Sequence, residues 1–457
     1  MFIKSSSAVF ILLMFLISAC QDSSNSLNLP STVEIDLCAG KLTNTPFAFG
    51  DGSVGEPYGL CSAEQLNAIG SNAAYIDKNF KLYKNLDLAS YTSNSFNLIA
   101  SSASPFTGVF DGNGKVISNL VYSDTTASGD FLGLFRKIGS AGIVKNLGLT
   151  GANITGRDYV GPLAGESVGI IDNCYAKGTV SGSTRIGGLL GRFWETSAAT
   201  YVKDSYAEST VSGTGFVGGL VGWVRGTVMG SHAIGSVTSG GDRVGGLIGS
   251  GDQATVINSY AEGTVTGRDM IGGLVGIIAP NISGSHYIGT LNCRTWCGGI
   301  TGAFGQSSSS GKVQKSWSTV TINSTGGQAG GIFGYGYANY SIENSYATTT
   351  MNSTVQWLGG LAGYTEGAIV NSYAVPVTIG GATAERGGIS GEVGGSISGS
   401  FWNSDLDATI VYTDGSANLS VAGASSTAVM KTAQTYIDAN WDTNIWNIQN
   451  GSYPTLK

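Results

Sequence analysis

The clearest regularity of the chain is a short block of glycine and aliphatic residues that returns at nearly constant intervals. Each block has the form (Val/Ile)-Gly-Gly-Leu-(Val/Leu/Ile)-Gly or a close variant. The blocks begin at Gly161, Gly187, Gly218, Gly245, Gly272, Gly298, Gly330, Gly359 and Gly387. Successive blocks start 26, 31, 27, 27, 26, 32, 29 and 28 residues apart. A repeat of this length is one supersecondary unit that buries its apolar side against the next copy, so the pattern predicts a stacked solenoid.

Between the blocks, hydrophobic and polar positions recur in the same order in every copy. An aliphatic position comes first, at Ile171, Val202, Val228, Val256, Ile282, Val313, Ile342, Ile369 and Ile397. Three residues later comes a small position, at Cys174, Ser205, Ser231, Ser259, Ser285, Ser316, Ser345, Ser372 and Ser400. An aromatic position follows directly, at Tyr175, Tyr206, His232, Tyr260, His286, Trp317, Tyr346, Tyr373 and Phe401. A second aliphatic position lies at Val180, Val211, Val237, Val265, Leu291, Ile322 and Met351. Alternation with a period of two places the small and second aliphatic positions on one side, so we expect the aromatic column to face outward and stack on its own copies.

These columns predict an all-β fold. Three short strands fit one copy: one at the glycine block, one at the Asn-Ser-Tyr-Ala stretch and one at the Gly-Thr-Val-Thr stretch. We therefore expect a parallel β-solenoid with coils of about 26–32 residues, in which equivalent side chains of successive coils form ladders. The expected right-handedness comes from the general preference of parallel crossovers.

The chain divides into five predicted segments. Residues 1–20 form a lipoprotein signal peptide, 21–32 a flexible tether, 33–130 N-terminal capping coils, 131–403 the repeat solenoid and 404–457 a C-terminal cap. Ser62 and Gln65 predict a capping box at the start of a short helix. Trp441, Trp446 and Tyr453 are expected to cover the last apolar coil, because a solenoid end is otherwise an open sheet edge.

The first twenty residues indicate export. Lys4 precedes an apolar run that ends in Ile17-Ser18-Ala19-Cys20, which is typical of a secretory signal. The last four residues resemble the bacterial lipobox, which implies that Cys20 is lipidated and anchors the chain to a membrane. Gln21 follows the cysteine, and we therefore favour an outer-membrane or cell-surface location.

The other five cysteines fit an oxidising compartment. Cys38 and Cys61 are the expected disulfide pair of the N-terminal segment, and Cys293 and Cys297 flank a tight turn and could also pair. Cys174 stands where the other copies have serine, which predicts a buried small residue.

Composition narrows the classes of function. The net charge of −7 and the presence of only two histidines give no support to nucleic-acid binding. Acids and bases are sparse, and the adjacent pairs Arg157-Asp158, Asp242-Arg243, Arg268-Asp269 and Glu385-Arg386 are interpreted as surface ion pairs. We expect no catalytic site, no metal site and no cofactor, and hence no enzyme.

The glycine blocks resemble the GLUG motif, named for its Gly-Leu-(any)-Gly core. The core is present as Gly-Gly-Leu-Leu-Gly from Gly187 and as Gly-Gly-Leu-Val-Gly from Gly218 and Gly272. Variants such as Gly-Gly-Ile-Thr-Gly from Gly298 keep a hydrophobic residue at the leucine position. The resemblance covers about residues 131–403 and implies a β-solenoid of a bacterial surface or secreted protein. The family does not imply a single activity.

Two outward surfaces are candidates for ligand binding. The first is a row two residues before each glycine doublet, whose ligand-rim candidates are Tyr159, Arg185, Phe216, Arg243, Trp296 and Trp357. Aromatic and arginine side chains there could stack sugars or hold a protein, although the row could equally be loop filler. The second is a Thr-x-Thr array resembling the ice-binding faces of some solenoids, with candidates Thr179, Thr210, Thr238, Thr264, Thr266, Thr290 and Thr321.

The sequence therefore predicts a lipid-anchored, adhesin-like binding or scaffold protein with a glycan, matrix or cell-surface ligand. Two alternatives stay open: ice binding through the Thr-x-Thr face, and a polysaccharide-acting β-helix enzyme.

Overall fold

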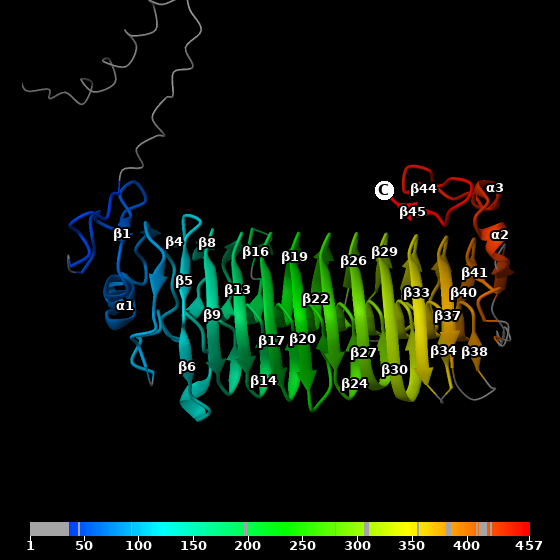
Figure 1. Ribbon diagram of the computed structural model, residues 1–457, viewed down its shortest axis with the longest axis horizontal. Helices are drawn as coiled ribbons and strands as arrows, with labels where there is room; N and C mark the ends of the chain where they lie inside the picture. Colours follow the sequence, from blue (N-terminus) through cyan, green and yellow to red (C-terminus); the bar gives the residue numbers. More distant parts are fainter. Residues whose placement is uncertain are drawn as a thin grey trace, which may run out of the picture. The chain divides into compact units, whose positions relative to one another are not determined.

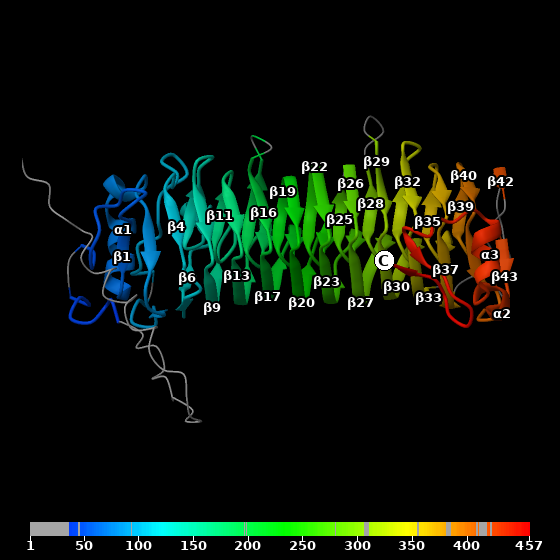
Figure 2. The same ribbon diagram turned by 90° about the horizontal axis from the view of Figure 1, so that it is seen from above.

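The computed structural model describes residues 36–43, 46–92, 94–195, 197, 199–278, 280–305, 310–353, 356–380, 385–407, 410, 418–420 and 423–457. The predicted signal peptide, Cys20 and the tether lie outside these ranges. The unit from Gly40 to Lys457 is a parallel β-solenoid of about 11 coils (Figure 1). Its strands form two long sheets that face each other across one continuous core, as the view from above also shows (Figure 2).

Each coil contributes up to four strands, two to each sheet. In sheet B, long strands carry the aromatic and second aliphatic columns: β9 (Gly148–Thr155), β13 (Tyr175–Ser181), β17 (Tyr206–Gly213), β20 (His232–Ser239), β23 (Tyr260–Thr266), β27 (His286–Gly298), β30 (Trp317–Gly330), β33 (Tyr346–Ser353) and β37 (Tyr373–Ile379). Short strands of the same sheet lead into the glycine doublets: β10 (Asp158–Val160), β14 (Thr184–Gly187), β18 (Gly215–Gly218), β21 (Val244–Gly245), β24 (Asp269–Gly272), β34 (Leu358–Gly359) and β38 (Arg386–Gly387).

Sheet A holds the return path of each coil. The strands that follow the doublets are β7 (Phe135–Ile138), β11 (Ala164–Ser167), β15 (Leu190–Trp194), β19 (Val221–Met229), β22 (Ile248–Ile257), β25 (Val275–Ile278), β28 (Thr301–Phe304), β31 (Phe333–Gly336), β35 (Ala362–Thr365) and β39 (Ser390–Val393). The first aliphatic column lies in β8 (Ile143–Lys145), β12 (Ile170–Asp172), β16 (Tyr201–Lys203), β26 (Pro280–Ser283), β29 (Gly311–Gln314), β32 (Tyr340–Glu343), β36 (Ile369–Val370) and β40 (Ser396–Ser398), and within β19 and β22.

The strand division differs from the three segments predicted for each copy. The Asn-Ser-Tyr-Ala and Gly-Thr-Val-Thr stretches share one strand, as in β23, where Tyr260 to Thr266 pair continuously with His286 to Asn292. The aliphatic column instead forms its own strand segment. The cause is that the aromatic and valine positions alternate on a single extended segment with no residue that breaks it.

The glycine doublets are required by close packing of successive coils. A Cβ atom on Gly246 would lie 2.1 Å from the carbonyl oxygen of Gly273 in the next coil, and one on Gly273 would lie 2.2 Å from that of Gly299. Real Cβ atoms do not approach backbone this closely, so the repeat needs glycine at these positions.

The predicted ladders are present in the interior. The valine column is buried, with Val211 at 0% and Val180 at 1% exposure. The serine column is also buried, and each serine side chain is hydrogen-bonded to backbone of its own coil and of the neighbouring coil. Cys174 is a buried free thiol at the start of this column, as predicted.

The same parallel pairing continues on both sides of residues 131–403. At the N-terminal end the elements are β1 (Tyr58–Leu60), α1 (Ala63–Ser71), η1 (Ala73–Tyr75), β2 (Phe80–Leu82), β3 (Leu86–Asp87), β4 (Val109–Asp111), β5 (Val116–Ser118), β6 (Val121–Ser123) and η2 (Ala127–Gly129). The predicted helix is present, because the Ser62 side chain accepts the N–H of Gln65 and the Gln65 side chain accepts the N–H of Cys61.

The C-terminal elements are β41 (Phe401–Asn403), β42 (Asn418–Ser420), β43 (Gly423–Ser425), α2 (Thr427–Met430), α3 (Ala433–Asp438), β44 (Trp446–Asn447) and β45 (Thr455–Leu456). Trp441 and Trp446 do not lie over the open end of the last coil as expected. They pack with Tyr373 and Phe401 of the aromatic column, and the Trp446 indole donates to Asn344 Oδ1 at 3.3 Å. The segment therefore runs back along the side of the solenoid (Figure 1), because the outward aromatic rings offer more apolar surface than the polar neighbouring strands.

Candidate functional site

The predicted rim forms one continuous row along the solenoid. Val160, which follows Tyr159, pairs with Ile186, which follows Arg185, and Ile186 pairs with Val217 after Phe216. Every member of the row has a positive φ, from 52° at Phe216 to 67° at Glu385. The row comprises Tyr159, Arg185, Phe216, Arg243, Met270, Trp296, Gln328, Trp357 and Glu385, and we call it the rim row. The left-handed conformation turns each coil at this corner and directs the side chain outward, where all nine are partly exposed.

Aromatic rings and guanidinium groups alternate along the first part of the rim row. Phe131 and Tyr159 stack with centroids 4.4 Å apart. The Arg185 guanidinium lies 4.7 Å from the Tyr159 centroid and 5.4 Å from that of Phe216, and the Arg243 guanidinium lies 5.0 Å from Phe216. The faces of these rings are thus covered by their neighbours along the solenoid axis. Sugar stacking on the rim aromatics stays a prediction. In this stretch the faces of Tyr159 and Phe216 are already in contact with arginine side chains.

The stacked row continues onto the outward face of sheet A. The Arg192 guanidinium lies 4.8 Å from Tyr159 and 5.3 Å from Trp194. Trp194 stacks on Trp223 at 4.9 Å, and the Arg225 guanidinium lies 5.1 Å from Trp194. We call the whole group the aromatic–arginine cluster; its members are Tyr159, Arg185, Arg192, Trp194, Phe216, Trp223, Arg225 and Arg243.

A weak sequence signal exists for the sheet A members of this cluster. Arg192 pairs with Trp223 and Trp194 with Arg225 in neighbouring strands. Each stands at an outward position of its strand, alternating with buried Phe193 and Val224. A count of aromatic and arginine residues restricted to outward positions of the strand after the doublet would have found them.

The arginines of the cluster differ in charge compensation. Arg192 forms an ion pair with Glu166, which is 1% exposed and is also bound by Lys137 at 2.8 Å. Arg225 donates to Gln253 Oε1 at 2.9 Å, and Arg185 to Thr184 Oγ1 at 3.4 Å. Within the described part of the chain, no carboxylate lies within ion-pair distance of Arg185, Arg225 or Arg243.

An open cavity of about 320 Å³ adjoins the cluster. Its walls are polar: Glu195, Ser197, Arg225, Gly226, Thr227, Gln253 and Thr255. The Glu195 carboxylate accepts the backbone N–H of Thr227 at 3.0 Å, which fixes the carboxylate at the cavity wall. Hydroxyl, amide, carboxylate and guanidinium groups in one depression are the donors and acceptors that bind a polar, polyhydroxylated ligand.

A second group of aromatic side chains lies farther along the same edge. Trp296 lies 5.3 Å from Tyr335, Tyr335 stacks on Tyr364 at 4.9 Å, and Trp357 lies 6.3 Å from Tyr364. Both tyrosine hydroxyls donate to Glu366. Partial burial, with the nearby Glu366 charge as a second cause, raises the pKa of Tyr335 to about 12.

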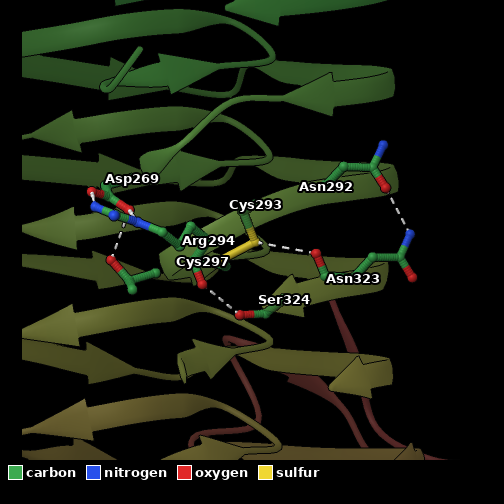
Figure 3. Close-up of a disulfide and its surroundings, with 8 residues drawn as sticks. Asp269, Asn292, Cys293, Arg294, Cys297, Asn323 and Ser324 are labelled. Atoms are coloured by element: carbon green, nitrogen blue, oxygen red, sulfur yellow. Dashed lines mark hydrogen bonds and ion pairs between the residues drawn. A yellow bond between two sulfur atoms is a disulfide. The ribbon is translucent and has the colours of Figure 1, made fainter. Parts of the chain in front are cut away.

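Cys293 and Cys297 form a disulfide that encloses Trp296. Figure 3 shows the bridge within β27, with the Cys293 sulfur directed toward the carbonyl oxygen of Asn323 at 3.7 Å. Beside it, Arg294 reaches back to Asp269 of the preceding coil, with Nε 2.8 Å from Oδ1. The bridge thus lies within one coil, and Trp296 of the rim row stands inside the short loop that it closes. Cys38 and Cys61 are also disulfide-bonded, and their pairing with each other stays a prediction.

The Thr-x-Thr candidates are in register on sheet B. Thr179 pairs with Thr210, Thr238 with Thr266, and Thr264 with Thr290, which pairs with Thr321. Farther on, however, Asn292 donates to Thr266, and Asn323 to Asn292. These amides are engaged with one another along the axis, which leaves fewer free groups to order water.

The aromatic column stacks on itself as expected. From Tyr175 to Trp317, successive ring centroids lie 4.4–5.0 Å apart with interplanar angles of 2–7°. Burial in the stack lowers the pKa of His232 and His286, while Glu262 opposes the shift at both.

The predicted ion pairs between sequence neighbours are mostly replaced by pairs between coils. Arg157 binds Asp130 with Nε 2.7 Å from Oδ1, and Arg268 binds Asp242 at 2.8 Å. Parallel stacking brings residues about one coil apart within reach, and adjacent strand residues point to opposite sides. Among the described residues there is no group of three or more metal-ligating side chains and no helix long and apolar enough to cross a membrane.

Fold and corner geometry together define a parallel β-solenoid built from glycine-doublet coils. Residues 240–266 match the GLUG motif, and blocks of the same form recur from Gly161 to Gly387.

The chain is similar to two curated proteins. It is 36% identical over 162 residues to halomucin of Haloquadratum walsbyi, which covers 34% of this chain and 2% of halomucin. It is 34% identical over 140 residues to a candidate Gly-rich membrane protein of Evansella cellulosilytica, covering 29% of this chain and 16% of that protein. The matches therefore span a small part of either relative.

Two solved structures align with parts of this chain. A candidate immunoglobulin A1 protease from Bacteroides ovatus aligns over 90% of this chain and 95% of its own, with 19% identity and a TM-score of 0.39. A structure named IgA1 protease aligns over 64% of this chain and 21% of its own, with 18% identity and a TM-score of 0.44. At these scores neither likeness carries an argument about activity.

Proposed function

We propose that this chain is a lipid-anchored cell-surface protein that acts as an adhesin-like binder of a glycan, matrix or cell-surface ligand. The observation that carries the proposal is the rim row, which places one outward side chain at the same corner of each successive repeat. Most members of the row are aromatic or arginine residues, which supply most of the energy of typical binding surfaces.

The proposed location rests on the sequence and on the names of two relatives. Ile17-Ser18-Ala19-Cys20 resembles a lipobox, and the relatives are named halomucin and a Gly-rich membrane protein. Metabolic labelling with a fatty-acid analogue tests the anchor: labelling should require Cys20 and disappear in Cys20→Ser.

Binding is tested by screening the full chain against glycan arrays, matrix proteins and whole cells. Trp296→Ala and Trp357→Ala probe the second aromatic group, and Arg185→Gln with Phe216→Ala probes the aromatic–arginine cluster. Trp317→Ala is a matched control, because Trp317 is a partly exposed tryptophan of the sheet B aromatic column. Loss of binding in rim variants and not in the control supports the proposal. A chain that binds none of these surfaces would contradict it.

A further inference from the structure

Three arginines of the aromatic–arginine cluster stand without a carboxylate partner among the described residues. They are Arg185, Arg225 and Arg243. Outside the cluster, Arg157, Arg268 and Arg294 each bind an aspartate of the preceding coil. Arg136 and Arg386 donate instead to backbone carbonyl oxygens. The protein has a net charge of −7 and hence an excess of acids, so the gathering of three arginines without carboxylate partners in one cluster calls for an explanation.

Stacking on aromatic rings orients these guanidinium groups so that they can bind an anion. Arg185 lies between the rings of Tyr159 and Phe216, and Arg243 lies on Phe216 from the other side. A guanidinium held by its faces loses little further freedom on binding, while its N–H edges stay available. Those edges match the two oxygens of a carboxylate, which they bind in a bidentate manner.

We propose that the ligand of this surface is an acidic oligosaccharide, bound through sugar carboxylates by Arg185, Arg225 and Arg243. The inference rests on the proposed binding function and names its ligand class. Arg225 joins the cluster to the polar cavity, where Gln253, Thr227 and Glu195 can hydrogen-bond sugar hydroxyls. The carboxylates lie over the arginines, and a neighbouring sugar ring occupies the cavity.

A sugar fits this surface better than an acidic peptide. Extended peptides commonly bind by adding a strand to an open sheet edge. Here β19 is already paired with β15 and β16 on one side and with β22 on the other. A peptide would have to bind without backbone pairing, whereas the hydroxyl-rich cavity offers partners for each sugar unit.

The spacing of the arginines indicates a repeating polymer. Arg185 and Arg243 occupy the same corner two coils apart, which corresponds to about 9–10 Å along the sheet. A linear polysaccharide aligned with the solenoid axis and carrying carboxylates at that interval engages both side chains at once.

The test uses the full chain and calorimetric titration with a defined oligogalacturonate as probe. The methyl-esterified form of the same oligosaccharide and a polyglutamate of similar charge are the comparison ligands. We expect binding to the acidic sugar that weakens with rising ionic strength, and affinity for the ester at least about tenfold lower.

Matched arginine variants distinguish binding at a defined site from a general effect of net charge. Arg185→Gln with Arg243→Gln removes two cluster arginines, and Arg268→Gln with Arg294→Gln removes two ion-paired arginines of nearby coils. Both double variants change the net charge equally. We expect a loss of about tenfold or more in the first and less than about twofold in the second. Arg185→Lys with Arg243→Lys keeps the charge and controls for misfolding; it should bind with intermediate affinity.

Equal weakening in both Gln variants, or equal binding of polyglutamate, overturns the inference. If rim variants abolish binding to another surface ligand while neither sugar form binds, the ligand class is wrong and the proposed function stands. If nothing binds, both fail.

Discussion

The backbone N–H of Ser205 donates to the side-chain oxygen of Ser231 in the next coil at 3.2 Å, and the Ser231 hydroxyl donates to the carbonyl of Met229 at 2.9 Å. The same pair of bonds links Ser231 to Ser259 and continues to Ser400. One hydroxyl thus satisfies two buried backbone groups in each coil. The serine column is therefore a structural element of the solenoid core.

Ser231→Ala should lower the stability of the central coils by about 1–3 kcal/mol, because it leaves the buried N–H of Ser205 without its acceptor. The measurement is urea unfolding followed by circular dichroism. Ser236→Ala is the matched control, since Ser236 is exposed on the adjoining strand, and its unfolding curve should be unchanged. Equal effects of the two substitutions would contradict the structural role of the column.

Gly246→Ala should prevent normal stacking of two coils. The added methyl group meets the carbonyl oxygen of Gly273 at 2.1 Å, and relieving such an overlap costs roughly 1–3 kcal/mol or more. Gly240→Ala is the control, because no atom lies within 4 Å of a Cβ there. The midpoint of thermal unfolding should fall in the first variant alone.

Stability should fall when the pH drops below about 6.5, the ordinary pKa of histidine. Burial lowers the pKa of His232 and His286 in the folded chain. A proton then binds the unfolded chain more readily than the folded one, so protonation favours unfolding. The two neutral histidines contribute their full stabilisation at a pH above the ordinary histidine pKa. This stabilisation is lost progressively as the pH falls through the lowered pKa values of the folded chain.

The pH effect is measured as the unfolding midpoint between about pH 7.5 and pH 5, a range in which most carboxylates stay ionised. His232→Tyr with His286→Tyr should reduce the slope, because neighbouring coils carry tyrosine at this position. An unchanged slope in the double variant would assign the effect to other groups.

Loss of the Cys293–Cys297 bridge should loosen the corner that carries Trp296. The bridge closes a loop of only a few residues, so the expected loss of stability is about 2 kcal/mol. The double variant Cys293→Ser with Cys297→Ser is compared with Cys174→Ser. The control changes a free cysteine to the serine that the later repeats carry at the same position. Tryptophan fluorescence anisotropy should fall in the double variant and stay constant in the control.

The Thr-x-Thr face should give little thermal hysteresis. Its second column changes from Thr266 to Asn292 and Asn323, whose amides bond along the axis, and bonded groups are poorly placed to order a water lattice. Measuring the freezing-point gap of the purified chain tests this. A large gap that Thr264→Val or Thr290→Val abolishes would favour ice binding.

The coil and its ladders follow from the order of residues along the chain. A period of two along each strand and a repeat of 26–32 residues specify which side chains stack, because in a parallel solenoid equivalent residues occupy equivalent positions. Hence the burial of Ser205 and Val211 and the outward stack from Tyr175 follow from spacing alone.

What the rim offers to a ligand depends on tertiary packing. Arg185 and Phe216 lie in successive repeats, and no local pattern reveals that the guanidinium covers the ring face. The contact of Arg192 with Tyr159 depends in the same way on how two separate strands pack. The contact of Trp446 with Tyr373 depends on the path of the C-terminal segment. Side-chain neighbours across a corner are fixed by packing and not by periodicity. The fold and the position of the rim row were therefore predictable, while the contacts among their side chains were not.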